Sequence, residues 1–236
     1  FRTAPSDARG GQILADITKD RKIKSVAITY TNNDYGKGLA DVYEAAVKAH
    51  GIKVTTVAAH EDGKADYSAE VATLASAGGD AVAVIGYLDQ GGKGIIQGSL
   101  DSGAFDTFIL SDGMIGDSLT DTFGKDLNKS FGSLPGSTGK GAGVFKKVAK
   151  AGGIDSSGPY TGESYDAAAL ITLAMQAGGK ADRATIQKNV MSVANAPGKK
   201  IYPGELGKAL DLLAKGKAIN YEGATGVEFT EVGEAF

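Results

Sequence analysis

The sequence of 236 residues contains no cysteine. This absence excludes disulfide bonds, thiolate nucleophiles and metal sites built from thiolates. It does not identify the compartment, because a protein without cysteine is compatible with an oxidising periplasm as well as with the cytoplasm. An excess of positive charge is also missing, since the formal net charge is −3. Nucleic acid is therefore excluded as a partner, because nothing in the composition attracts a phosphate backbone.

Long apolar runs are missing as well. No run approaches the roughly 18 apolar residues that cross a bilayer. No basic start followed by an apolar stretch marks a signal peptide. The sequence opens on Phe1 rather than Met, so a missing signal says nothing about export. A hydrophobic content of 42% is typical of a chain that buries a core.

Motifs that carry chemistry are absent too. The segment Gly86–Lys93 resembles a phosphate loop, but its spacing is one residue too long and Gly94 replaces the hydroxyl that binds magnesium. His50 and His60 have no partners at metal or triad spacing, so we expect both at the surface. No G-x-S-x-G elbow occurs. We therefore predict a protein without a catalytic site, a metal or a cofactor, that is, not an enzyme.

The first half of the chain alternates between two patterns. Apolar, β-branched runs predict strands, and apolar residues at helical spacing between them predict helices. The strands are expected near 25–30, 53–58, 80–85 and 107–110, with helices from about 34 to 50, 68 to 77 and 88 to 100. Strands that alternate with helices through short turns indicate a parallel α/β sheet covered on both faces.

The second half has a different texture. Residues 131–139 are too rich in Gly, Pro and Ser for a helix or a central strand, and we interpret them as a crossover between domains. Helices are then expected near 142–151, 162–177, 182–194 and 205–215, with a short strand only around 227–229. This half is either a helical domain or part of a domain whose sheet lies elsewhere. Glu163 and Asp166 begin one of these helices, where acids stabilise the dipole.

In parallel α/β sheets, ligands bind beyond the carboxyl ends of the strands. The segments that follow the predicted strands are Thr31–Gly38 (TNNDYGKG), Gly86-Tyr87 and Ser111–Met114 (SDGM). With residues 1–7 (FRTAPSD), 160–167 (YTGESYDA) and 220–226 (NYEGATG), they resemble the Leu/Ile/Val-binding family of type I periplasmic binding proteins. The match runs in order along nearly the whole chain.

The resemblance implies a two-lobed α/β fold in which parallel sheets are flanked by helices and three crossovers join the lobes. Residues 1–5 would be the first crossover, 6–129 a complete ligand-binding lobe, 130–217 the second half of the other lobe, and 218–236 the third crossover with the start of the C-terminal strands. It also implies a periplasmic solute-binding protein that captures a small molecule between the lobes, an amino acid or a related compound. Its partner would be the membrane permease of an ABC transporter.

The resemblance also implies site residues. Tyr35 and Tyr87 match aromatic residues that line the cleft, Asp112 matches an acid that pairs with the α-ammonium group of the ligand, and Tyr160 matches an aromatic residue on the opposite lobe. A tyrosine offers a rigid apolar face and one hydroxyl, and a carboxylate in a closed site favours a cationic group. Each of these residues could instead have a purely structural role. Tyr35 would pack over a helix start, Tyr87 would cover the end of the sheet, Asp112 would cap a turn, and Tyr160 would anchor a loop.

Family members carry a further segment before the equivalent of Phe1. That segment forms the first half of one lobe and includes the Ser/Thr-rich loops that hold the carboxylate of the ligand. We expect the chain to be a fragment, or its N-terminal segment to be a separate chain, and the carboxylate site is not assigned. Two other functions remain open, a ligand-sensing domain of the same fold and an α/β enzyme with catalytic groups in the segment not seen.

Overall fold

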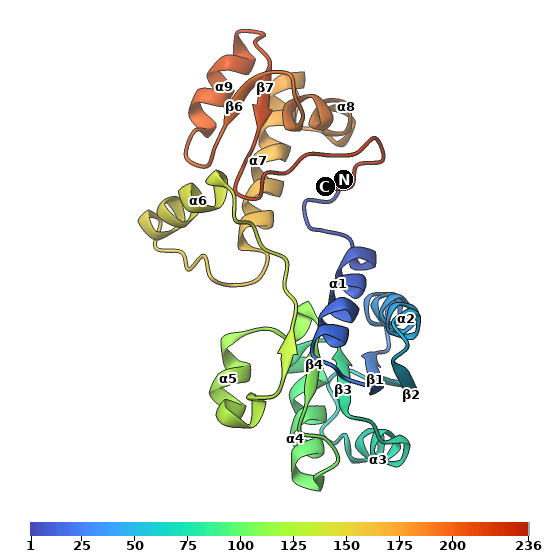
Figure 1. Cartoon of the computed structure of the whole chain (residues 1–236). Helices are drawn as coiled ribbons and strands as arrows, with labels where there is room; N and C mark the ends of the chain where they lie inside the picture. Colours follow the sequence, from blue (N-terminus) through green and yellow to red (C-terminus); the bar gives the residue numbers. More distant parts are fainter. Residues whose placement is uncertain (236) are drawn as a thin grey trace. The chain divides into compact units, whose positions relative to one another are not determined.

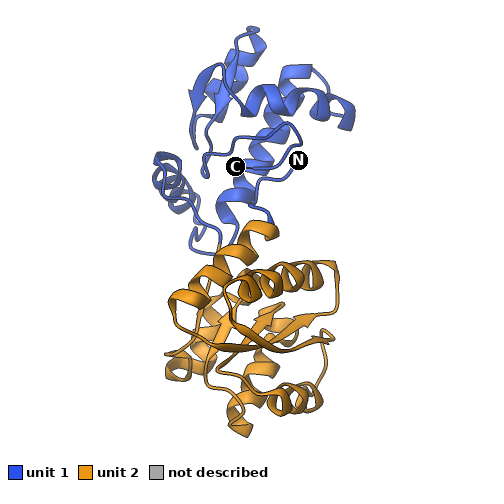
Figure 2. Ribbon diagram, turned by 45° about the vertical axis from the view of Figure 1, so that its right-hand side comes forward, with its two compact units in different colours: residues 1–6, 135–236 blue, residues 7–134 orange. Residues whose placement is uncertain are grey.

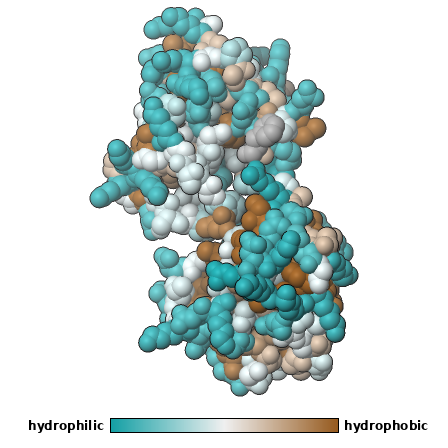
Figure 3. Space-filling model, in the orientation of Figure 1, coloured by the Kyte–Doolittle hydropathy of each residue, from teal (hydrophilic) through white to brown (hydrophobic). Residues whose placement is uncertain are grey.

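The computed structural model describes residues 1–235, which divide into two compact units (Figures 1 and 2). The sheet unit comprises Asp7–Leu134. The helical unit comprises Phe1–Ser6 together with the chain from Pro135 onward. No helix within residues 1–235 is long and apolar enough to span a membrane. In the view of Figure 3, hydrophilic residues cover most of the surface of each unit, with smaller apolar areas among them.

The sheet unit contains five parallel strands in the order β2-β1-β3-β4-β5. They are β1 (Ser25–Thr31), β2 (Lys53–His60), β3 (Ala81–Ile85), β4 (Phe108–Leu110) and β5 (Phe131–Gly132). The central strand β3 is buried along its whole length, which is why its sequence AVAVI carries no polar residue. The predicted parallel α/β sheet is confirmed. Its edge strand β5 was not predicted, because it lies at the start of the Gly- and Ser-rich segment 131–139, which we interpreted as a crossover.

Helices cover both faces of this sheet (Figure 1). They are α1 (Asp7–Asp20), α2 (Asp34–Ala49), α3 (Ser68–Ala77), α4 (Lys93–Ser102) and α5 (Asp117–Phe123). Successive residues of β3 face opposite sides, so that Ala83 packs with Leu14 of α1 and Tyr43 of α2, whereas Val84 packs with Leu74 of α3 and Ile95 of α4. The sequence did not reveal α1, because its apolar positions are interrupted by Gly10 and Gly11.

In its described part, the helical unit contains four α-helices and a small parallel sheet. The helices are α6 (Lys140–Ala151), α7 (Thr161–Gly178), α8 (Arg183–Ala194) and α9 (Leu206–Ala214), each within two residues of its predicted ends. The strands β6 (Lys199–Ile201) and β7 (Ile219–Tyr221) pair with each other. The prediction of a strand at 227–229 was wrong, since Phe229 forms only an isolated bridge with Ala235. Strands β6 and β7 were not predicted, because strands of three residues are too short to show the alternation of apolar and polar residues.

Candidate functional site

The carboxyl edge of the sheet brings together three of the predicted site residues. Tyr35 lies in the first turn of α2, just after β1, and Tyr87 and Asp112 follow β3 and β4. The rings of Tyr35 and Tyr87 stack with their centroids 5.3 Å apart at an angle of 26°. The Tyr35 hydroxyl donates a hydrogen bond of 2.7 Å to Asp112 Oδ1. Residues 77 positions apart in the sequence thus form one continuous surface.

A tight turn between β1 and α2 places Tyr35. The Asn33 side chain accepts the Gly36 N–H at 2.9 Å and caps the helix, which satisfies one of the donors left open at a helix start. A Cβ atom on Gly36 would lie 2.1 Å from the carbonyl oxygen of Thr31. Only glycine therefore lets the helix start this close to the strand, and the turn leaves Tyr35 over the end of the sheet.

A second close approach places Asp112. A Cβ atom on Gly113 would lie 2.4 Å from the carbonyl oxygen of Gly86 and 3.1 Å from the Tyr35 hydroxyl. The loops after β3 and β4 therefore touch at this point, and glycine is required for the contact. Because Gly86 precedes Tyr87 and Gly113 follows Asp112, the contact sets the spacing of these two site residues.

The Tyr35 phenol is neutral in this environment. Burial raises its pKa well above the ordinary value of 10.0, and the nearby charge of Asp112 acts in the same direction, whereas the hydrogen bond with Ser111 opposes the shift. A neutral phenol is a hydrogen-bond donor. The site therefore offers two aromatic rings, one fixed phenol proton and one carboxyl group, a set that suits a small ligand with a cationic group and an apolar part.

The predicted site residue Tyr160 belongs to the helical unit. It directly precedes α7 and adopts the left-handed conformation with φ of 59°. This conformation is uncommon for residues other than glycine. The contribution of Tyr160 to a ligand site stays a prediction.

The prediction that His60 lies at the surface was wrong. That prediction rested on its polar neighbours in the sequence. His60 is 1% exposed at the end of β2, and its Nδ1 lies 2.9 Å from Thr29 Oγ1. Its Nε2 has no hydrogen-bond partner among the described residues. Burial lowers the pKa of the imidazole below its ordinary value of 6.5. The run His60-Glu61-Asp62 misled the prediction, because the histidine is the last residue of a strand and points inward.

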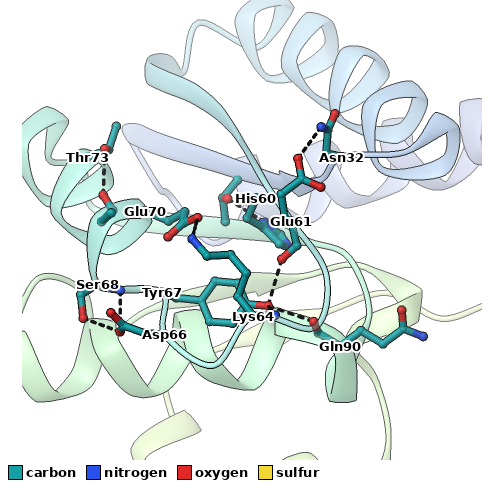
Figure 4. Close-up of polar contacts among 12 residues, drawn as sticks. Asn32, His60, Glu61, Lys64, Asp66, Tyr67, Ser68, Glu70, Thr73 and Gln90 are labelled. Atoms are coloured by element: carbon teal, nitrogen blue, oxygen red, sulfur yellow. Dashed lines mark hydrogen bonds and ion pairs between the residues drawn. The ribbon is translucent and has the colours of Figure 1, made fainter.

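A polar network covers His60 (Figure 4). The Tyr67 hydroxyl lies 2.9 Å from the Gln90 carbonyl oxygen and 3.0 Å from that of Glu61, and the Tyr67 ring meets His60 edge-on at 6.2 Å. One tyrosine thus ties the loop after β2 to the loop after β3. No sequence pattern indicated this role, since Tyr67 lies outside any motif.

Asp166 also differs from the prediction that it serves the helix dipole. It lies in the second turn of α7, is completely buried and accepts four hydrogen bonds. Its Oδ1 accepts the Tyr221 hydroxyl at 2.9 Å and the Ala224 N–H at 2.7 Å, and its Oδ2 accepts the N–H and the hydroxyl of Thr225 at 2.8 and 2.7 Å. Asp166 therefore fixes the segment NYEGATG after β7 to the helix.

The alternative sites have structural explanations. Residues Leu88–Gly92 form a single π-type turn, and Lys93 pairs with Asp89 at 2.6 Å instead of facing a phosphate cradle. His50 pairs with Asp16 at 2.6 Å. Within residues 1–235, no group of three or more His, Cys, Asp and Glu side chains could hold a metal ion.

Comparisons with known proteins identify the family of the chain. The sequence matches the periplasmic binding protein family over residues 1–206. It is 31% identical over 195 residues to Leu/Ile/Val-binding protein homolog 1 of Brucella melitensis, which corresponds to 80% of this chain and 51% of that protein. It is 28% identical over 190 residues to an amino acid binding protein of Pseudomonas aeruginosa, covering 78% of this chain and 50% of that protein.

The solved structures show the same fold. A leucine binding protein from Thermotoga maritima superposes with a TM-score of 0.74 at 20% identity, over 99% of this chain and 61% of that one. The chain spans about half the length of the two curated relatives described above. With the family match over most of its residues, the chain belongs to the periplasmic binding protein family, whose members bind solutes and are not enzymes.

Proposed function

We propose that the chain is the ligand-binding part of a periplasmic substrate-binding protein of an ABC transporter, and that its ligand is an amino acid or a related small amine. The observation that carries the proposal is the contact of Tyr35, Tyr87 and Asp112 at the carboxyl edge of the sheet. Two relatives whose names refer to amino acids or to Leu, Ile and Val support the ligand class. Tyr160 is included as a further ligand contact on the family resemblance alone.

The chemistry of the three residues favours an ammonium group. A carboxylate forms its strongest hydrogen bonds with charged donors. Asp112 Oδ1 already accepts a hydrogen bond from the neutral Tyr35 phenol, and a charged donor of the ligand would add a stronger one. The faces of Tyr35 and Tyr87 attract cations and pack against aliphatic side chains. Residues that bind the carboxylate of the amino acid are expected in the segment that precedes Phe1 in the family.

The test is calorimetry on the full-length protein with the natural amino acids and their N-acetylated forms. The free amino acid should bind without being turned over, and Asp112→Asn should weaken its binding by about 2–5 kcal/mol, the cost of leaving one charge of a buried pair without its partner. Acetylation removes the cation and should have a similar effect.

The matched control is Asp121→Asn, which makes the same change of charge at an exposed position on α5. It should leave affinity unchanged. Binding of the acetylated and the free compound with equal affinity, or an equal loss in both Asp→Asn variants, would contradict the role of Asp112.

A further inference from the structure

One buried hydroxyl connects the parts of the site. Ser111 lies between β4 and Asp112 and is 1% exposed. Its Oγ accepts the Gly86 N–H at 3.3 Å and lies 3.1 Å from the Tyr35 hydroxyl. Ser111 therefore touches both the residue that precedes Tyr87 and the phenol that contacts Asp112, although it is too deeply buried to meet a ligand itself.

The direction of these hydrogen bonds follows from the number of protons. The Tyr35 oxygen has three polar neighbours, which are Asp112 Oδ1 at 2.7 Å, Ser111 Oγ at 3.1 Å and the Gly113 N–H at 3.4 Å. It has one proton to donate. A carboxylate accepts and cannot donate, and its contact is the shortest of the three, so the phenol proton points to Asp112.

The serine proton then completes the chain. Because the phenol proton is used on Asp112, it is not shared with Ser111 Oγ, and the Ser111 hydroxyl takes the donor role across the 3.1 Å that separate it from the Tyr35 oxygen. A hydrogen bond donated by Ser111 stabilises the ionised phenol, which agrees with its lowering effect on the pKa of Tyr35. The Ser111 oxygen accepts the N–H of Gly86. The result is a series of three hydrogen bonds in which each group donates to the next, from the Gly86 N–H through Ser111 and Tyr35 to Asp112. Hydrogen bonds in such a chain polarise one another, so that each one strengthens the next.

We propose that Ser111 is a positioning residue of the ligand site, which holds the Tyr35 proton on Asp112 and so fixes the phenol, the carboxyl group and the Tyr87 loop in one geometry before the ligand arrives. The inference rests on the proposed function, because it assumes that Tyr35 and Asp112 contact the ligand. A preorganised site loses less conformational freedom on binding, and the benefit appears as affinity.

A double-mutant cycle tests this role in the full-length protein, with L-leucine as the probe. Ser111→Ala should weaken leucine binding about 3- to 10-fold, the effect of one net hydrogen bond. In the Tyr35→Phe background, which lacks the acceptor, the same change should cost less than about 2-fold. A serine that only supported the backbone of Gly86 would cost the same in both backgrounds, so an equal loss would overturn the proposal, and so would no loss at all.

A matched control is Ser130→Ala. Ser130 also accepts a backbone N–H, that of Phe108 at 3.1 Å, but at the opposite end of β4. It should leave leucine affinity unchanged. If Ser111→Ala does not fold, Ser111→Cys takes its place, because a thiol has nearly the same shape and is a weaker donor.

The same cycle measured by urea unfolding without ligand separates this inference from the proposed function. The two changes should be coupled by about 2- to 10-fold in the unfolding equilibrium constant. If the unmodified protein does not bind leucine or another amine, the ligand class is wrong, and the unfolding cycle still decides whether the serine acts on the phenol. Additive effects on unfolding would overturn the hydrogen-bond chain and with it the role of Ser111.

Discussion

Substitution of Gly113 tests the site directly, because this residue lies where the loops after β3 and β4 touch. Gly113→Ala adds one methyl group that would lie 2.4 Å from the Gly86 carbonyl oxygen. An ordinary contact of this kind is about 1 Å longer, so the two loops must separate. The movement occurs beside the hydrogen bond of 2.7 Å between Tyr35 and Asp112, and it should lengthen or break that bond.

Two magnitudes follow from this movement. Forcing an extra methyl group into a tightly packed place costs about 1–3 kcal/mol of unfolding free energy. Affinity should fall further, because the variant loses the preorganised position of Asp112, and we expect at least about a 10-fold weaker binding of the amine ligand. Urea denaturation measures the first effect, and calorimetry on the full-length protein measures the second.

Gly38→Ala is the matched control. Gly38 lies on α2 in the same unit, and a Cβ atom there would meet no atom within 4 Å. The substitution should stabilise the protein by up to about 1 kcal/mol, because alanine favours the helix, and should leave affinity unchanged. If Gly113→Ala is as stable as the unmodified protein and binds as tightly, the close approach of the two loops does not hold the site together.

Three further predictions follow from the described contacts. Asp166→Ala removes the acceptor of four donors, two of them buried and two partly buried, and should cost about 3–5 kcal/mol of unfolding free energy, because the buried donors are left unsatisfied; a loss below about 1 kcal/mol in urea denaturation would refute the role given to this carboxylate. The folded pKa of His60 lies below the 6.5 of the unfolded chain, so the unfolded state binds more protons between the two values, and the contribution of His60 should be complete above pH 6.5 and decrease as the pH falls through this window. His60→Asn should flatten this dependence in unfolding curves between pH 5 and 8, and an unchanged slope would assign it to other groups. Tyr87→Ala should weaken ligand binding by about 1–3 kcal/mol, because an aromatic contact is lost, and unchanged calorimetry would remove this residue from the site.

The sequence predicted the sheet and the residues at its carboxyl edge well, for a physical reason. Buried parallel strands are continuous apolar runs such as AVAVI, and the residues just after them are where ligands bind in this architecture. Tyr35, Tyr87 and Asp112 could therefore be placed at one edge of the sheet from the sequence alone. Their mutual contacts could not, because the glycine contacts that set the spacing involve residues far apart in the chain.

The misplaced residues were those whose burial depends on distant partners. His60 and Asp166 are polar, and local patterns place polar residues at the surface or at helix ends. In the structure, Thr29 contacts His60. Tyr221 and the segment that follows it donate hydrogen bonds to Asp166. Strands β6 and β7 were missed for a related reason, since three residues each carry no readable period and each exists only through its pairing with the other.

The most direct test of the proposed ligand site is a crystal structure of the full-length protein with its bound ligand. We predict a ligand nitrogen within hydrogen-bond distance of the Asp112 carboxyl group, and ligand atoms in contact with the rings of Tyr35 and Tyr87. A ligand bound without touching any of these three residues, or a ligand whose group facing Asp112 carries no positive charge, would contradict the proposed site.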